Sequence, residues 1–152
     1  MHPPKPDSDG GYLEAAARII FMGGLNRQVV DGKWPGFREV FANFDVHAVA
    51  AFDDDDVDRI AADDRVIKYR AKLAAVVKNA RTIAAMAADH GSFAAYVDEL
   101  YAMEGPGGAS RALAKEFTYV SEQGAKHWLY ATGYDIGDVT DKVRRKYAPF
   151  GG

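Results

Sequence analysis

Apolar residues in this chain recur at intervals of three and four positions, which is the spacing of one face of an α-helix. The repeat is clear at Phe37, Val40, Phe41 and Phe44, and it extends over the stretch 66–88. The pattern indicates no strands, because apolar and polar residues do not alternate over any stretch of strand length. The sequence therefore predicts an all-α fold, a compact bundle of short helices.

Capping residues and helix breakers divide this pattern into segments. Gly32 is expected to end one short helix, Pro35 to stand at an early position of the next, and the run Gly105-Pro106-Gly107-Gly108 to form a loop. N-caps are expected at Ser8 or Asp9, at Asp45, within Asp53 to Asp56, at Ser92 and at Ser110. The helices are expected over 10–21, 25–30, 33–44, 46–52, 54–60, 66–88, 93–101, 111–117, 125–133 and 139–147.

The chain has 152 residues, 48% of them apolar, which is enough for one globular domain with a core. Residues 1–9 are expected to form an extended N-terminal arm and residues 10–152 a single helical domain. The absence of cysteine excludes disulfides, thiolate catalysis and cysteine-based zinc or iron–sulfur sites. No apolar run has the length of a membrane span, and the first residues do not resemble a signal peptide. We expect a monomeric, cytoplasmic protein without a metal or other cofactor.

The net charge of −3 gives no overall attraction to nucleic acid, but the charges are unevenly distributed. Aspartates are concentrated between positions 53 and 64, whereas the charged residues of 65–81 are all basic. One interpretation is an acidic helix start followed by a solvated basic helix face. The other is a face that contacts DNA phosphates through Lys68, Arg70 and Lys72.

The segment 117–141 indicates two helices joined by a tight turn. An apolar and aromatic run breaks at Ser121-Glu122-Gln123-Gly124, and a second apolar run follows. Backbone N–H groups at the start of the second helix can hold an anion such as a DNA phosphate, although the carboxylate of Glu122 competes for the same groups. The candidate DNA contacts of this turn are Ser121, Gln123, Gly124 and Lys126.

This segment resembles the helix-hairpin-helix of DNA glycosylases, specifically that of the 3-methyladenine DNA glycosylase I family. Phe117, Tyr119 and Val120 fall on the family's F-x-F-V-G turn, with Ser121 in place of its glycine. The resemblance covers residues 12 to 134 and implies a DNA-glycosylase-like fold. Further blocks match in the family's order, namely Gly24-Leu25, Phe37-Arg38, Phe44-Asp45, Asp56-Val57-Asp58-Arg59, 66–73 and Asn79-Ala80-Arg81.

The resemblance also shows which family residues are replaced here. Members of the family hold a structural zinc with an N-terminal segment, which carries a Cys and a Tyr-His-Asp-x-Glu-Trp-Gly motif, and with His and Cys near the C-terminus. This chain begins later than that segment and has no cysteine. No zinc is therefore expected to bind in that way. The family's base-reading glutamate falls on Ile19, and Arg27 replaces the tryptophan that would stack on an extruded base. The base pocket implied by the resemblance is lined by Ile19, Met22, Arg27 and Trp128, and the alternative for Trp128 is a place in the core.

A carboxylate after the hairpin is the remaining catalytic candidate. Many helix-hairpin-helix glycosylases place an aspartate before a V-[KR]-R sequence, where it stabilises the cationic sugar and helps water to attack. Here Val143-Arg144-Arg145 matches that sequence, and the expected position falls on Thr140. The flanking Asp141, one residue away, and Asp138 are therefore the candidate catalytic carboxylates. Alternatively, Asp138 is the N-cap and Asp141 a first-turn acid of the last helix. Arg144 and Arg145 are further candidate DNA contacts.

Two functions remain open on the sequence. The first is monofunctional hydrolysis of the N-glycosidic bond of alkylated purines of the 3-methyladenine type in damaged duplex DNA. Lys126 does not fit the position of the Schiff-base lysine in bifunctional relatives. The second function is that of a glycosylase fold that has lost catalysis and binds DNA or a protein partner.

Overall fold

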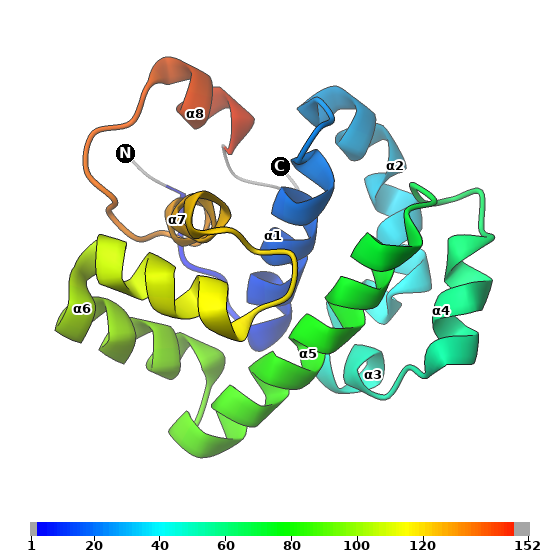
Figure 1. The fold of residues 1–152 in the computed structure, drawn as a ribbon, viewed down its shortest axis with the longest axis horizontal. Helices are drawn as coiled ribbons and strands as arrows, with labels where there is room; N and C mark the ends of the chain where they lie inside the picture. Colours follow the sequence, from blue (N-terminus) through cyan, green and yellow to red (C-terminus); the bar gives the residue numbers. More distant parts are fainter. Residues whose placement is uncertain (1–2, 148–152) are drawn as a thin grey trace.

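The computed structural model describes residues 3–147, in which every regular element is helical, and this confirms the predicted all-α fold. Helix α1 lies in the middle, with α2 to α4 on one side and α6 to α8 on the other, while the long helix α5 runs across the bundle (Figure 1). No helix among these residues is both long and apolar enough to cross a membrane. The elements are α1 (Asp9–Met22), α2 (Arg27–Val40), the 3-10 turn η1 (Ala42–Phe44), α3 (Val46–Ala50), α4 (Asp54–Ala61), α5 (Arg70–His90), α6 (Phe93–Glu116), α7 (Glu122–Ala131) and α8 (Asp141–Lys146).

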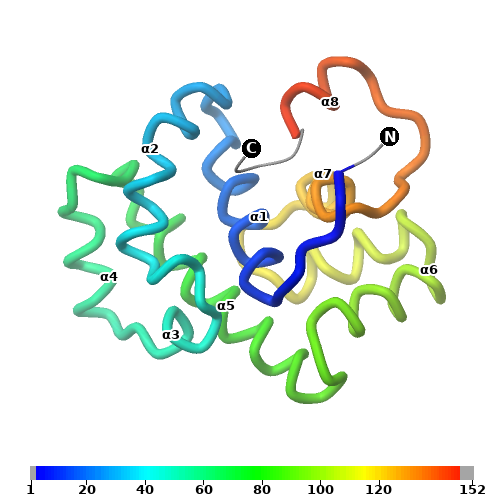
Figure 2. Tube along the Cα trace, turned by 180° about the vertical axis from the view of Figure 1, so that it is seen from behind, coloured from blue at the N-terminus to red at the C-terminus, as the bar shows by residue number. Residues whose placement is uncertain are grey.

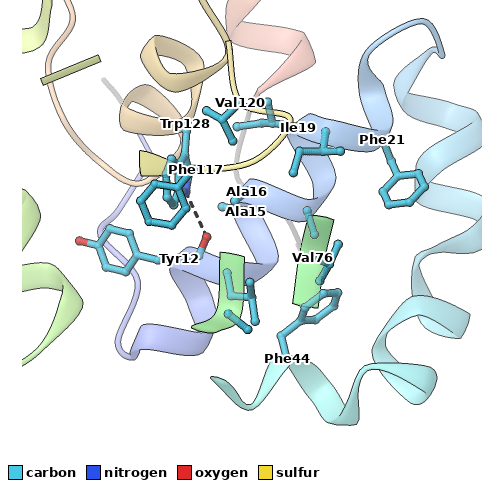
Figure 3. Packing of buried hydrophobic residues seen from close by; sticks show 14 of the residues in the cluster. Tyr12, Ala15, Ala16, Ile19, Phe21, Phe44, Val76, Phe117, Val120 and Trp128 are labelled. Carbon is cyan, nitrogen blue, oxygen red and sulfur yellow. Dashed lines mark hydrogen bonds between the residues drawn. The ribbon is translucent and has the colours of Figure 1, made fainter. Parts of the chain in front are cut away.

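Helix α1 is buried around its whole circumference, as expected for a helix at the centre of a bundle. Every residue from Ala15 to Met22 is less than a tenth exposed. Ile19 points toward Val120 in the turn after α6, while Phe21 points the opposite way, toward α2 (Figure 3). The core is therefore continuous through α1 from one group of helices to the other.

Both tryptophans belong to this core. Trp34 stacks on Phe44 with ring centroids 5.4 Å apart, and its indole N–H donates to Glu14. Trp128 stacks on Phe93 at 5.7 Å, and its indole N–H donates to a backbone carbonyl of α1 at 3.0 Å. Each indole thus buries its ring and satisfies its one donor, which is the usual requirement for a core tryptophan.

The predicted helix starts that depend on neighbouring residues are confirmed. Asp53 accepts the N–H of Asp56 while Asp56 accepts that of Asp53, which is a reciprocal capping box at the start of α4. The other confirmed caps are Ser8 on α1, Asp45 on α3 and Ser92 on α6.

The predicted break at Gly32 is wrong, because α2 continues through both Gly32 and Pro35. Val30, Trp34 and Phe37 are each at most 1% exposed, and they lie on one face of the helix. Burial of this face outweighs the backbone hydrogen bond that Pro35 removes in mid-helix and the weak helix propensity of glycine.

The break predicted at residues 105–108 is present but shorter than expected: α6 (Phe93–Glu116) consists of two helical halves that turn back on each other (Figure 1), and only Gly105 is out of helical conformation. Gly105 has φ 70° and ψ 177°, which is essentially restricted to glycine. Pro106 then begins the second half of the helix. Ser110 is not an N-cap but lies inside this half, where its hydroxyl donates to the carbonyl of Pro106 at 2.6 Å.

Other helix boundaries also differ from the prediction. The helix expected over 33–44 ends at Val40, and the next turn, Ala42–Phe44, has φ angles of 52° to 59°, in the left-handed region. Helix α5 starts at Arg70 rather than at residue 66 because Tyr69 is extended. At the start of α8 the N-cap is Thr140, which accepts from the N–H of Val143, so Asp138 does not cap this helix.

The described part of the N-terminal arm crosses α7 (Figure 2), and it lies beside Gly133, just after the end of that helix. The amine of Lys5 is 3.0 Å from Asp98 on α6 and 4.7 Å from the ring of Tyr134. Tyr134 donates to the same carboxylate at 2.6 Å and is 2.9 Å from the buried hydroxyl of Tyr12. These polar contacts tie the arm, α1, α6 and the end of α7 together.

The contribution of Asp98 to stability should depend on pH. Burial alone would raise the pKa of Asp98, but the hydroxyl of Tyr134 and the ammonium of Lys5 outweigh it, so the pKa lies below its ordinary value. A carboxylate with a lowered pKa stabilises the fold above its unfolded-state pKa of about 4, and this stabilisation is lost as the pH falls through the lower folded-state value.

We therefore expect Asp98→Asn to lower the melting temperature at pH 7 and to have progressively less effect below pH ~4. Thermal unfolding of both proteins between pH 7 and pH 3 checks this. A difference in melting temperature that is constant over the range would contradict the assigned ion pair.

Candidate nucleic-acid interface and base pocket

The turn between α6 and α7 is fixed by one buried side chain of α5. Asn79 is 1% exposed, accepts from the N–H of Thr118 at 2.8 Å and donates to the carbonyl of Thr118 at 3.0 Å. The next residue, Tyr119, has φ 61°, a left-handed conformation that is uncommon outside glycine. The turn passes beside α5 and α1 (Figure 1). A tertiary contact therefore holds the backbone of this turn in place.

The turn ends in an N-cap at the start of α7. The hydroxyl of Ser121 accepts from the N–H of Gly124 at 2.9 Å, which occupies one of the donors predicted to hold a phosphate. The N–H groups of Glu122 and Gln123 have no acceptor within the helix, as is usual in a first turn. The side-chain amide of Gln123 lies 2.9 Å from Nε2 of His127. The anion-binding capacity of this helix start is thus reduced by the serine and the glutamate.

Most of the predicted phosphate-contacting cations are engaged within the protein. The three carboxylates that pair with them are 62 to 93% exposed, so these are surface ion pairs that a phosphate can replace at little cost. The acidic segment that includes α4 supplies two of these carboxylates. Phosphate binding by these cations remains a proposal. The contacts are Lys68 with Asp64, Arg70 with Asp58, Arg144 with Asp141, and Lys72 with the carbonyl of Gly23.

The predicted base-pocket residues of α1 and α7 are buried. Ile19 is 9% exposed, Met22 1% and Trp128 2%. Trp128 lies beside Phe117, and its ring is enclosed by aromatic neighbours (Figure 3). In this arrangement these three side chains offer no open face on which an extruded base could stack.

Arg27, the fourth pocket residue, connects α2 to the end of α8. Its Nε is 3.2 Å from Asp31, and its Nη1 donates to the carbonyl of Arg145 at 2.9 Å. Arg145 itself has an exposed side chain. Because the last carbonyls of a helix carry partial negative charge, Arg27 is well placed to hold α8 against α2.

His127 provides a second contact between α8 and the rest of the fold. Its ring stacks on Tyr147 with centroids 4.3 Å apart. Burial lowers the pKa of His127, and the charges of Lys146 and Lys126 lower it further. The imidazole is therefore neutral at pH 7. Lys126 is half-buried on α7, one residue from this stack.

The two candidate carboxylates have different surroundings. Asp138 lines a hollow of about 240 Å³ that is formed mainly by the loop between α7 and α8, with Tyr130 on its wall. Asp141 is the first residue of α8, its side chain is 78% exposed, and it pairs with Arg144. Asp138 is exposed as well, and Arg144, the ion-pair partner of Asp141, lines the same hollow. Within residues 3–147 no group of three or more histidine, aspartate or glutamate side chains could hold a metal ion.

Two residues of this region were not singled out from the sequence. Asn79 interrupts the apolar stripe of α5 between Val76 and Ile83, and a polar residue in such a stripe needs a buried partner. The place of Asn79 in this stripe is therefore a signal in the sequence from which its buried hydrogen-bonding role could have been predicted. Tyr69 gave no such signal, because its exposure and its contact with Tyr119 depend on the path of the chain before α5.

A model of the family described as methyladenine glycosylase matches residues 17–127 of this chain. Among curated proteins, DNA-3-methyladenine glycosylase 1 of Escherichia coli strain K12 is 31% identical in an alignment of 83 residues, and the match covers 49% of this chain and 44% of that protein. The matched stretch thus spans less than half the length of this relative.

Solved structures of 3-methyladenine DNA glycosylase I have the same fold. The enzyme from Staphylococcus aureus, which recognises 3-methyladenine, matches with a TM-score of 0.77 and 19% identity over 88% of this chain and 81% of that chain. A solution structure of a 3-methyladenine DNA glycosylase I matches with a TM-score of 0.72 and 25% identity over 93% of this chain and 84% of that chain.

Proposed function

Because the chain belongs to the methyladenine glycosylase family, we propose that it hydrolyses the N-glycosidic bond of alkylated purines of the 3-methyladenine type in duplex DNA. Water adds to the sugar carbon, and the carbon–nitrogen bond breaks. The free base is released, and an abasic site remains in the DNA. The family match over residues 17–127, which include the C-terminal part of α1 and the turn before α7, is the observation that carries this proposal.

Three parts of this chain have roles in the proposed reaction. The N–H groups at the start of α7 and the side chains of Lys68, Arg70, Lys72, Arg144 and Arg145 contact the phosphates, after the surface ion pairs exchange for DNA. A carboxylate stabilises the positive charge that develops on the sugar, which is an electrostatic role. Asp138 fits this role better than Asp141 does, because it lines a hollow while Asp141 is paired with Arg144.

The proposal is tested with a duplex that carries a single 3-methyladenine or 7-methylguanine. Excess protein should convert the lesion to an abasic site, detected as a strand break after alkali. Asp138→Asn should slow this conversion about 100-fold, which is the typical cost of losing one charge-stabilising group. Asp89→Asn, an exposed change at the far end of α5, is the matched control. If Asp138→Asn forms abasic product at the wild-type rate, then either Asp141 stabilises the charge on the sugar or catalysis depends on base binding alone.

A second candidate function is binding without catalysis, to DNA or to a protein partner. It is favoured by the burial of Ile19 and Trp128 and by the contact of Arg27 with the end of α8, which leave no open base pocket in this arrangement. Salt-sensitive binding to duplex DNA with no base release would support the DNA-binding form of this candidate.

A further inference from the structure

Two tyrosine rings are exposed side by side where the α6–α7 turn meets the start of α5. Tyr69 is 48% exposed and Tyr119 is 49% exposed, and their ring centroids are 6.4 Å apart with an interplanar angle of 79°. Large apolar side chains normally have a reason to stay at the surface when they gather in one place. We call this pair the tyrosine platform.

The backbone under the tyrosine platform is held firmly. Tyr119 follows the residue that Asn79 clamps with two hydrogen bonds, and it keeps φ 61°. Tyr69 is the residue just before α5, and its N–H donates to the carbonyl of Ile67 at 2.9 Å. The fold positions both backbones, and the two side chains contact each other as well, so the rings are available to a ligand without a large ordering cost.

A cation lies next to the rings. The amine of Lys72 is 5.1 Å from the centre of the Tyr69 ring and donates to the carbonyl of Gly23 at 2.9 Å. Exposed aromatic rings beside a positive charge are the combination with which proteins bind unpaired nucleic-acid bases, since the rings stack on the base and the cation attracts the backbone. The residues after Gly23, in the loop between α1 and α2, are exposed as well.

We propose that Tyr69 and Tyr119 form a platform that stacks on an unstacked nucleobase of the DNA, beside the site where a damaged nucleotide leaves the helix. The inference rests on the proposed DNA function and adds to it a pair of residues that binds distorted DNA. Stacking of this kind is tolerant of sequence, because every base has an aromatic face. The platform therefore gives a preference for distorted over intact duplex, without a preference for a particular base.

The test compares binding to two duplexes of the same sequence, one intact and one with a tetrahydrofuran abasic analogue that leaves the opposite base unpaired. Fluorescence anisotropy at low salt gives both dissociation constants. Wild type should prefer the abasic duplex by roughly tenfold or more, given the usual strength of base–aromatic stacking. The double variant Tyr69→Leu with Tyr119→Leu should lose this preference while retaining its affinity for the intact duplex within about threefold.

Two controls make the comparison specific. The double variant Tyr69→Phe with Tyr119→Phe keeps both rings and should retain the preference. Met103→Ala removes an apolar side chain that is 73% exposed on α6 and should behave as wild type. Leucine and phenylalanine at position 119 meet the same left-handed backbone as tyrosine does, so the variants differ in ring chemistry rather than in backbone strain.

A preference for the abasic duplex that survives both leucine substitutions would overturn the tyrosine platform. Equal binding of both duplexes by wild type would also overturn it, and the proposed base release would stand or fall separately in the alkylated-duplex assay. No binding to either duplex at low salt would contradict the DNA function and the platform together.

Discussion

Gly36→Ala should destabilise the folded chain by about 3 kcal/mol, because no space exists for one more methyl group at this position. A Cβ atom on Gly36 would lie 2.1 Å from the carbonyl oxygen of Arg65 and 2.8 Å from its carbon. Both atoms belong to the backbone, so α2 and the segment before α5 would have to move apart. For a chain of this length the loss corresponds to a fall of roughly 10 °C in melting temperature.

The matched control is the same substitution one helical turn earlier. A Cβ atom on Gly32 would meet nothing within 4 Å, although Gly32 lies in the same helix. Gly32→Ala should therefore stabilise the protein by about 0.5–1 kcal/mol through its better helix propensity. Opposite signs in the two thermal unfolding curves would support the packing described for α2, whereas a neutral Gly36→Ala would contradict it.

Asn79→Ala should cost about 2–4 kcal/mol and should loosen the α6–α7 turn in particular. The substitution removes two hydrogen bonds and leaves the N–H and carbonyl of Thr118 without their partner. Hydrogen exchange at the Thr118 amide should become faster by more than the change in global stability explains. The preference for distorted DNA should fall as well, because Tyr119 follows directly after the clamped residue.

Lys78→Ala, an exposed change at the neighbouring position of α5, is the control for this prediction and should leave both measurements unchanged. An Asn79→Ala variant with wild-type exchange at Thr118 would show that the turn holds its conformation without the clamp.

The structural features that were predictable from the sequence are those decided by nearby residues. The caps at Asp45, Asp53 and Ser92 each depend on a side chain and a backbone N–H three residues away, and all three are present. The break expected at residues 105–108 is present at Gly105, where only glycine suits the backbone. The break expected at Gly32 was wrong because tertiary burial overrode local propensity. A helix that buries one whole face tolerates a glycine and a proline that would end it in isolation.

The candidate site likewise has features that nearby residues decide and features that distant contacts decide. The ordered motifs predicted the family, and the family match confirms it. The ion pair between Lys68 and Asp64 is local in sequence, but the contact of Arg27 with the carbonyl of Arg145 joins residues 118 positions apart. Contacts of that kind decide whether a predicted pocket is open, and no spacing rule within one helix reveals them.

A chain that releases alkylated bases from DNA, as proposed, must produce the free base, and the most direct test is to look for it. Methylated duplex DNA is incubated with the wild-type protein, and the small molecules released are separated by chromatography. Free 3-methyladenine should appear in proportion to the abasic sites formed. The absence of any free methylated base, under conditions in which the same protein binds the duplex, would contradict the proposed base release.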